Sequence, residues 1–401
     1  MARSLVILVA DGLRPDVLER ALASGQVPAL AELAERGGRY EIVTSFPSVT
    51  GAAYVPILTG LHPGRAGVPG LRWFDRTDRT AFWRGYSRSY VGPQLGRLAH
   101  DLYPGVRTLF EIAGERSLGL FALVTRGLPR RLRVERGLGS AWRAATSFLS
   151  GNVAGWIAWE RRLAADFVDK VRRSKPTLAV AAFQGTDKAA HLAGSDSHMV
   201  LDALRTVDWV VASLRRDTER DGRWRDTSIW VVSDHGHAGV EHHDDLARGL
   251  ADHGLAVLSH PWTLGWRRDV AVMVSGNAMA HVYVELERRE RLPWDRLSGR
   301  WEWLASALLE RPSVDLLVVQ RAPGISEVRS PRLGKALVVR RGSRLSYRPL
   351  DGNPLETDPF EDASVEEVFL RTFRGTYPDA PLQIAELAGS ERAGDLILSA
   401  R

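Results

Sequence analysis

Short apolar runs rich in β-branched residues alternate along the chain with longer segments of helical periodicity. The runs are residues 5–10, 118–124, 177–183, 228–233, 270–275 and 281–285. Helical periodicity is clear over residues 199–216 and 294–309. Strands that alternate with helices favour parallel pairing, because each crossover helix packs back onto a face of the sheet. We therefore predict an α/β fold, a three-layer α/β/α sandwich with a mostly parallel central sheet.

Residues 71–173 interrupt this alternation with a segment rich in arginine and tryptophan. Two interpretations fit it: a helical layer that covers one sheet edge with its charged heads in water, or a cap whose arginines face an anionic substrate. Hydrophobic and charged fractions of 44% and 25% are those of an ordinary compact protein. We predict a single domain over residues 1–401, with residues 71–173 as an inserted cap.

Composition excludes several classes of protein. The chain has no cysteine, which rules out disulfides, thiolate metal ligands and cysteine nucleophiles. Its net charge of +6 comes with interleaved acids and no recognisable reading module, so we expect no nucleic-acid partner. No apolar run approaches the about 20 residues of a transmembrane segment, and the first run is too short for a signal peptide. The expected location is cytoplasmic.

Residues that could bind metal or attack phosphorus follow several predicted strands, where open α/β sheets place their sites. Asp11 ends the first strand, in LVILVADGLRPD, and could also simply cap the next helix. Thr50, in SFPSVTGAAYVPILTG, precedes an apolar helical run. At a helix N-terminus it would be either a plain N-cap or a hydroxyl beside N–H groups that favour a phosphoryl oxygen.

Two more groups follow the strands predicted at 177–183 and 228–233. Asp187 and His191 lie four residues apart, on one face of a helix, either as a surface hydrogen bond or as two ligands of one metal. Asp234 and His235 end the other strand, in SIWVVSDHGHAGVEHHDDL. This window holds four of the chain's 11 histidines, a density of His and Asp that is typical of a metal site.

In this order, the four segments resemble the type I phosphodiesterase and nucleotide pyrophosphatase branch of the alkaline phosphatase superfamily. VADGLRPD resembles the family's first metal-ligand segment, and PSVTGAAYVPILTGLHPGRAGVPG resembles its nucleophile segment. TDKAAH resembles its Asp-x-x-x-His element, and SDHG resembles its most diagnostic element. The resemblance covers residues 1–70 and about 177–285. It implies an alkaline phosphatase-like fold, a metal-activated nucleophile at Thr50 and a phosphothreonine intermediate.

The resemblance also implies two divalent metal ions, typically zinc. Manganese accepts the same carboxylate and imidazole donors, so spacing does not separate the two metals. The ligands implied for the first ion are Asp11, Thr50, Asp234 and His235. Those implied for the second ion are Asp187, His191 and a third histidine.

The third histidine is the open position of this ligand set. In the related phosphoethanolamine transferases a ligand follows the SDHG histidine by about eight residues, which lands on His243. We prefer His243, with His242 and then His281 as alternatives. His237, just past the SDHG element, is expected to support the ligands without binding metal.

Two family residues that contact phosphate oxygens are replaced here. The position of an asparagine is taken by Leu71, and that of a histidine by Ala66. We expect Arg72 to supply the missing donor to the substrate. Lys188 and the cap arginines are the cations expected to meet any additional substrate charge.

These observations predict a two-metal phosphoric ester hydrolase that acts on a small-molecule phosphodiester or diphosphate. The same site could instead serve a phosphomonoesterase, a phosphonate hydrolase or a phosphotransferase. A non-catalytic protein that binds an anionic ligand is the alternative of a different class. The segments GWIAWERR and FALVTRGLPRRLR also suggest an amphipathic substrate, such as a lipid phosphate.

Overall fold

The structure is a computed structural model that describes residues 4–77, 87–134, 146–147, 150–260 and 268–401. The chain forms two compact units, each described separately below. Unit 1 comprises Met1–Ile42 and Arg107–Gly239, and unit 2 comprises Val43–Val106 and Val240–Arg401. The predicted cap, residues 71–173, is divided between the two units. Its function as a cap, and the single-domain organisation, stay predictions.

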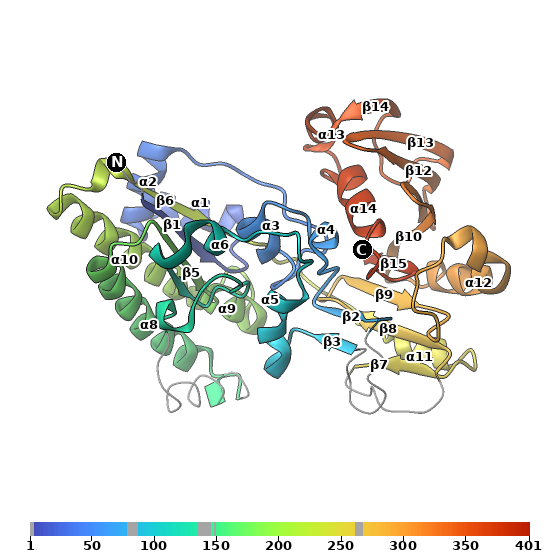
Figure 1. The fold of residues 1–401 in the computed structure, drawn as a ribbon, viewed down its shortest axis with the longest axis horizontal. Coiled ribbons are helices and arrows are strands. Elements are labelled where there is room, and N and C mark those ends of the chain that lie inside the picture. The colour runs from blue at the N-terminus through green and yellow to red at the C-terminus, as the bar shows by residue number, and fades with distance from the viewer. Residues whose placement is uncertain (1–3, 78–86, 135–145, 148–149, 261–267) are drawn as a thin grey trace. The chain divides into compact units, whose positions relative to one another are not determined.

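Unit 1 is built on a parallel sheet of four described strands, in the order β4-β5-β1-β6, of which β5, β1 and β6 are labelled in Figure 1. The strands are β1 (Ser4–Ala10), β4 (Ser117–Leu120), β5 (Leu178–Phe183) and β6 (Thr227–Val232). Each coincides with a predicted strand, and their parallel pairing confirms the predicted fold class. The strand predicted at 118–124 ends early because Phe121 has a φ of 49°, which extended backbone does not allow.

Helices cover the unit 1 sheet and carry its connections. They are α1 (Pro15–Ala23), α2 (Pro28–Gly37), α6 (Leu109–Ala113), α8 (Val153–Ser174), α9 (Gly185–Ala193) and α10 (His198–Arg220), with 3-10 turns η2 (Gly114–Arg116), η3 (Arg130–Leu132) and η4 (Trp224–Asp226). Helices α8, α9 and α10 pack on one another, and α10 also contacts α2. One core joins the face of β1 that carries Val6, Leu8 and Ala10 to residues of α8 and α10.

Unit 2 contains a sheet of nine described strands in the order β14-β13-β12-β11-β10-β15-β9-β8-β7. The strands are β7 (Val257–Ser259), β8 (Val270–Val274), β9 (Met279–Tyr283), β10 (Val314–Ala322), β11 (Ile325–Ser330), β12 (Gly334–Arg341), β13 (Arg344–Gly352), β14 (Phe360–Ser364) and β15 (Leu396–Ala400). All neighbours pair antiparallel except β7 and β8. The strands predicted at 270–275 and 281–285 are β8 and β9, which therefore belong to an antiparallel hairpin of this second sheet.

The remaining elements of unit 2 are helices and a small hairpin. The helices are α3 (Tyr54–Thr59), α4 (Pro63–Ala66), α5 (Leu98–Asp101), α11 (Leu246–Ala251), α12 (Trp294–Leu309), α13 (Val365–Thr372) and α14 (Ala380–Ala388), with the 3-10 turn η1 (Gly92–Arg97), and the hairpin pairs β2 (Arg72–Phe74) with β3 (Ser87–Ser89). Alternate residues of β10 face opposite cores: Leu317 and Val319 pack with α12, and Leu316 and Val318 with α14. Helix α12 has the predicted bounds.

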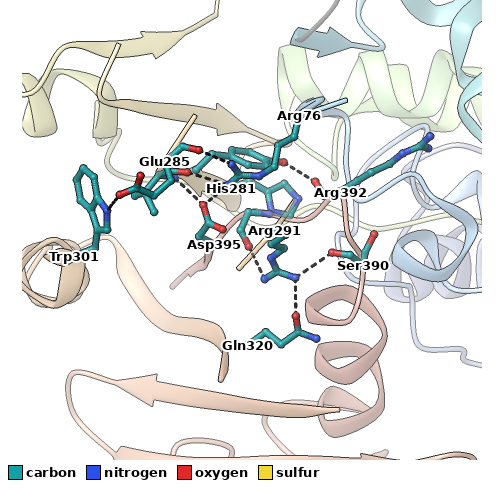
Figure 2. A network of polar contacts seen from close by, with 12 residues as sticks. Arg76, His281, Glu285, Arg291, Trp301, Gln320, Ser390, Arg392 and Asp395 are labelled. Carbon is teal, nitrogen blue, oxygen red and sulfur yellow. Dashed lines mark hydrogen bonds and ion pairs between the residues drawn. The ribbon is translucent and has the colours of Figure 1, made fainter. Parts of the chain in front are cut away.

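A buried polar network joins distant segments of unit 2 (Figure 2). The carboxylate of Asp395 accepts hydrogen bonds from Arg76 at 2.5 Å and from the N–H of Val284 at 2.7 Å. Arg291 donates to the carbonyl oxygen of Ser390 at 3.0 Å. Buried cations need such partners, because an uncompensated charge in the interior is strongly destabilising.

Two arginines of the predicted cap thus serve the core of unit 2. Arg76 is paired with Asp395, and Arg88 is paired with Asp75 at 2.9 Å and lies near Asp101. Both arginine side chains are about 95% buried or more. For these two residues the structure favours a packing function over contact with a substrate. Among the described residues, no helix is long and apolar enough to cross a membrane.

Candidate metal centre

Three carboxylates of unit 1 meet at the carboxyl ends of adjacent parallel strands. Asp11 follows β1, Asp234 follows β6, and Asp187 lies in the first turn of α9, directly after β5. Because β1 lies between β5 and β6, the three strand ends share one edge of the sheet. The N–H of Gly12 donates to Asp234 at 3.2 Å and ties the ends of β1 and β6 together.

The first group of ligand-type atoms comprises Asp187, His191 and His237. Asp187 Oδ1 lies 3.1 Å from His237 Nε2 and 3.4 Å from His191 Nε2, and the two imidazole rings are 4.7 Å apart. Asp187 Oδ1 and His237 Nε2 are both buried, yet neither has a hydrogen-bond partner of acceptable geometry in the described part of the chain. Two buried atoms that face each other without a hydrogen bond are arranged as two ligands of one cation would be.

The second group comprises Asp11, Asp187 and His235, so Asp187 belongs to both. His235 Nε2 lies 3.6 Å from Asp11 Oδ1 and 3.5 Å from Asp234 Oδ2. The other ring nitrogen, Nδ1, is 3.0 Å from the carbonyl oxygen of Gly236, which orients Nε2 toward the carboxylates. Within each group the ligand atoms lie no more than 4.8 Å from one another.

Gly12 is required by the geometry of this cluster. Its φ of +68° lies in the left-handed region that favours glycine. A Cβ atom at this position would lie 2.5 Å from His237 Nε2, closer than any real contact. The glycine after Asp11 therefore makes room for an imidazole that comes from the end of β6.

Burial and nearby charged groups shift the pKa of two carboxylates in the cluster. Burial, with a smaller contribution from the nearby charge of Asp187, raises the pKa of Asp234 to about 7, although the hydrogen bond from Gly12 opposes the rise. Burial also opposes the ionisation of Asp187, but the imidazoles of His191 and His237 outweigh it and hold its pKa well below its usual value. The contact with Asp187 raises the pKa of His191. Carboxylate and imidazole donors crowded in this way fit a divalent metal ion, which would neutralise their repulsion.

Thr50 lies in unit 2, where its position differs from the expected one. Helix α3 begins only at Tyr54, with Ala53 as its N-cap, so Thr50 stands in the turn before the helix. Gly51 has a φ of +97°, which ends any helical geometry between Thr50 and α3. The loop that carries Thr50 is packed within unit 2, where a Cβ atom at Gly276 would lie 3.0 Å from the side chain of Val49.

The two predicted substrate-binding cations lie in different units. Arg72, in β2, is half-buried, its Nε donates to Ser89 Oγ at 3.3 Å, and burial lowers its pKa. No carboxylate pairs with it among the described residues. Lys188, on α9, has its ammonium 4.5 Å from the centre of the Trp156 ring. Burial lowers the pKa of Lys188, against the opposing charges of Asp187 and Asp11.

The three histidines considered for the open ligand position lie in unit 2. His242 and His243 are exposed, outside any helix or strand. His281 is fully buried, donates from Nε2 to the carbonyl oxygen of Pro69 and accepts at Nδ1 from the N–H of Gly394. Burial lowers its pKa to about 4. With both nitrogens engaged, His281 has no lone pair to offer a metal.

Sequence reasoning assigned His237 a supporting role, whereas the structure groups it directly with Asp187 and His191. The available signal was the spacing of SDHGH, which places His237 two residues after His235. The approach of His237 to Asp187 on α9 depends on the path of the chain after β6, which residue spacing does not encode.

Comparison with known proteins identifies the family of the chain. Residues 5–325 match the type I phosphodiesterase/nucleotide pyrophosphatase family, and the chain belongs to that family, in the alkaline phosphatase superfamily. Members of this family depend on metal. As a member of the family, the chain is a phosphoester-hydrolysing enzyme. No curated protein matches the chain significantly.

Solved structures show the same fold at low identity. Phosphonoacetate hydrolase from Sinorhizobium meliloti 1021, in complex with phosphonoacetate, is 16% identical with a TM-score of 0.55, over 100% of this chain and 81% of that chain. An inactive threonine-to-alanine form of murine ectonucleotide pyrophosphatase/phosphodiesterase 5, in complex with AMP, is 13% identical with a TM-score of 0.52, over 99% of this chain and 78% of that chain. At this identity, the likenesses show a shared fold.

Proposed function

We propose that this enzyme is a metal-dependent phosphodiesterase of the nucleotide pyrophosphatase type, with Thr50 as nucleophile and a phosphothreonine intermediate. The observation that carries the proposal is the pair of ligand groups that share Asp187 at the strand ends of unit 1. The family membership and the inactive threonine-to-alanine form of the murine relative support a threonine nucleophile. Thr50 is the threonine of the nucleophile-like segment.

The proposed ligand set has two parts. Asp187, His191 and a third histidine would hold one ion, and we favour His237 over His243 as that histidine because its Nε2 already lies 3.1 Å from Asp187. The residues proposed to hold the other ion are Asp11, Thr50, Asp234 and His235. Zinc is the proposed metal, and manganese suits the same donors.

Divalent ions at such a centre lower the pKa of bound oxygens and neutralise charge on a phosphoryl group. The chain's own residues then have separate tasks. The Thr50 oxygen forms a bond to phosphorus as the bond from phosphorus to the leaving oxygen breaks, and the hydroxyl proton of Thr50 is balanced by the proton that the leaving oxygen takes up. A water oxygen next displaces Thr50 from phosphorus, and one proton of that water returns to the Thr50 oxygen. Balanced in this way, the reaction consumes one water per ester bond.

Substrate charge would be met by Arg72 and Lys188. Arg72 combines a half-buried guanidinium with the lack of a carboxylate partner among the described residues, a state that suits an anionic ligand. Lys188 is anchored over Trp156 beside the carboxylates. Trp156 is only 7% exposed, so it is a packing residue and gives no support to a lipid substrate.

Phosphonate hydrolysis is the second proposal. The observation in its favour is the structural likeness to a phosphonoacetate hydrolase solved with phosphonoacetate. The proposed mechanism would be unchanged except that the leaving atom is carbon. A phosphomonoesterase or phosphotransferase and a cytoplasmic location stay predictions.

The test compares substrates on one metal-loaded enzyme. Bis-p-nitrophenyl phosphate, p-nitrophenyl phosphate and phosphonoacetate are assayed with added zinc or manganese, and the diester should turn over fastest. Thr50→Ala should bind metal but lose turnover, and Thr50→Ser should keep partial activity. Mass spectrometry of the acid-quenched enzyme should find phosphate on Thr50. Full activity of Thr50→Ala would refute the nucleophile.

A further inference from the structure

Helix α9 carries three residues of the proposed centre but does not cap its own N-terminus. Asp187, Lys188 and His191 all lie on this helix of nine residues. Its N-cap, Gln184, makes no side-chain capping hydrogen bond. The first N–H groups of a helix need an acceptor, and in a buried helix that acceptor has to come from elsewhere in the protein.

The acceptor is the carboxylate of Glu160, from the neighbouring helix α8. Glu160 Oε1 accepts from the N–H of Gln184 at 2.7 Å and from the N–H of Gly185 at 3.2 Å, and Oε2 also lies 3.2 Å from Gly185. The side chain of Glu160 is fully buried. These oxygens satisfy N–H groups that the first turn of α9 cannot satisfy itself.

The contact leaves no room for adjustment on the α9 side. A Cβ at Gly185 would lie 2.6 Å from Glu160 Oε2 and 3.1 Å from the Cβ of Ala203 on α10. One turn earlier on α8, the ring of Trp156 lies under the ammonium of Lys188. Helix α8 therefore contacts α9 through the side-chain oxygens of Glu160 and through the Trp156 ring.

Burial of a carboxylate is costly, since the charged form loses its hydration. A local Ser or Asp at position 184 would cap the helix at much lower cost. Glu160 instead sets the distance between α8 and the first turn of α9, which begins only two residues before Asp187. The unfavourable burial of this carboxylate thus occurs at the helix that carries two of the proposed metal ligands.

We propose that Glu160 is a positioning residue for the metal centre: its carboxylate fixes the N-terminus of α9 so that Asp187 and His191 reach the same ion. The inference rests on the proposed metal-binding role of these two residues. Residues that orient ligands in this way typically contribute 10- to 100-fold to metal affinity.

The experiment measures binding of zinc or manganese alone, by titration calorimetry, to the full chain and three variants. Glu160→Gln keeps an oxygen at the same reach, so its affinity should stay within about threefold of wild type. Glu160→Asp keeps the charge but withdraws the oxygens by one methylene, and Glu160→Ala removes them. Both should bind metal about 10- to 100-fold more weakly. Asp169→Asn removes a partly exposed carboxylate from the same helix and is the matched control.

Circular dichroism of the metal-free proteins checks that each variant is folded. If Glu160→Ala does not fold, the comparison of Glu160→Gln with Glu160→Asp still tests the proposal. The proposal is overturned if the Asp variant binds metal like wild type, or if the Gln variant loses as much affinity as the Asp variant. Absence of metal binding by the wild-type chain would instead refute the metal centre itself. Because no substrate is present, failure of Thr50 as the nucleophile leaves this result untouched.

Discussion

The buried carboxylate of Glu160 gives the metal-free protein a pH-dependent stability that one substitution should remove. Burial raises the pKa of Glu160 to about 7 from a usual value of 4.5, although the N–H groups of Gln184 and Gly185 oppose the rise. Between these two pH values the folded state holds a proton that the unfolded state has lost. Stability from this group is therefore fully present below about pH 4.5 and is lost as pH rises through about 7.

The size of the effect follows from the same values. At roughly 1.4 kcal/mol for each pKa unit, the rise from 4.5 to about 7 corresponds to about 3 kcal/mol. Glu160→Gln has no proton to lose, so its free energy of unfolding relative to wild type should rise by about 3 kcal/mol between acidic and alkaline conditions. Chemical denaturation of both proteins in chelator, followed by circular dichroism across this pH range, measures the difference.

Asp169→Asn is the control for this measurement, since Asp169 is partly exposed and its pKa is lowered by Arg172. Its difference from wild type should stay constant above about pH 5, because the group is ionised there in both the folded and unfolded states. A Glu160→Gln difference that does not change with pH would refute the argument, because it would mean that burial does not perturb this carboxyl group.

Three further substitutions test other parts of the structure. Gly12→Ala forces a Cβ against His237 and costs about 1–2 kcal/mol of left-handed strain, so calorimetry should find weaker metal binding; unchanged affinity would contradict the close approach. Asp395→Asn leaves Arg76 buried without a charged partner, and denaturation should show a loss of about 3–5 kcal/mol rather than a neutral effect. Arg72→Ala should lower kcat/KM for a diester about tenfold or more, and an unchanged value would exclude Arg72 from substrate binding.

The ligand cluster of unit 1 could be predicted from the sequence because its carboxylates follow recognisable strands. Asp11, Asp187 and Asp234 each follow a short apolar run, and parallel strands bring their carboxyl ends to one edge. Local periodicity thus predicted both the strands and the meeting of these side chains. The approach of His237 to Asp187 depends on the irregular segment after β6, which no periodicity describes.

The sheet pairing and the buried ion pairs of unit 2 were harder to predict from the sequence, because they depend on long-range contacts. The apolar runs at β8 and β9 were predicted as strands, but a buried run does not reveal whether its neighbour is parallel or antiparallel. The ion pair between Arg76 and Asp395 joins residues 319 positions apart. Composition alone therefore could not distinguish an arginine that binds substrate from one that is paired in the core.

The central claim is that the cluster around Asp187 supports metal-dependent ester hydrolysis, and one measurement tests it most directly. Hydrolysis of bis-p-nitrophenyl phosphate is followed for wild type and Asp187→Asn, each stripped with chelator and then titrated with zinc or manganese. Wild type should be inactive when stripped and recover with metal. Asp187→Asn, which loses the ligand common to both groups, should stay inactive at the same metal concentrations. Wild-type rates in Asp187→Asn would contradict the claim.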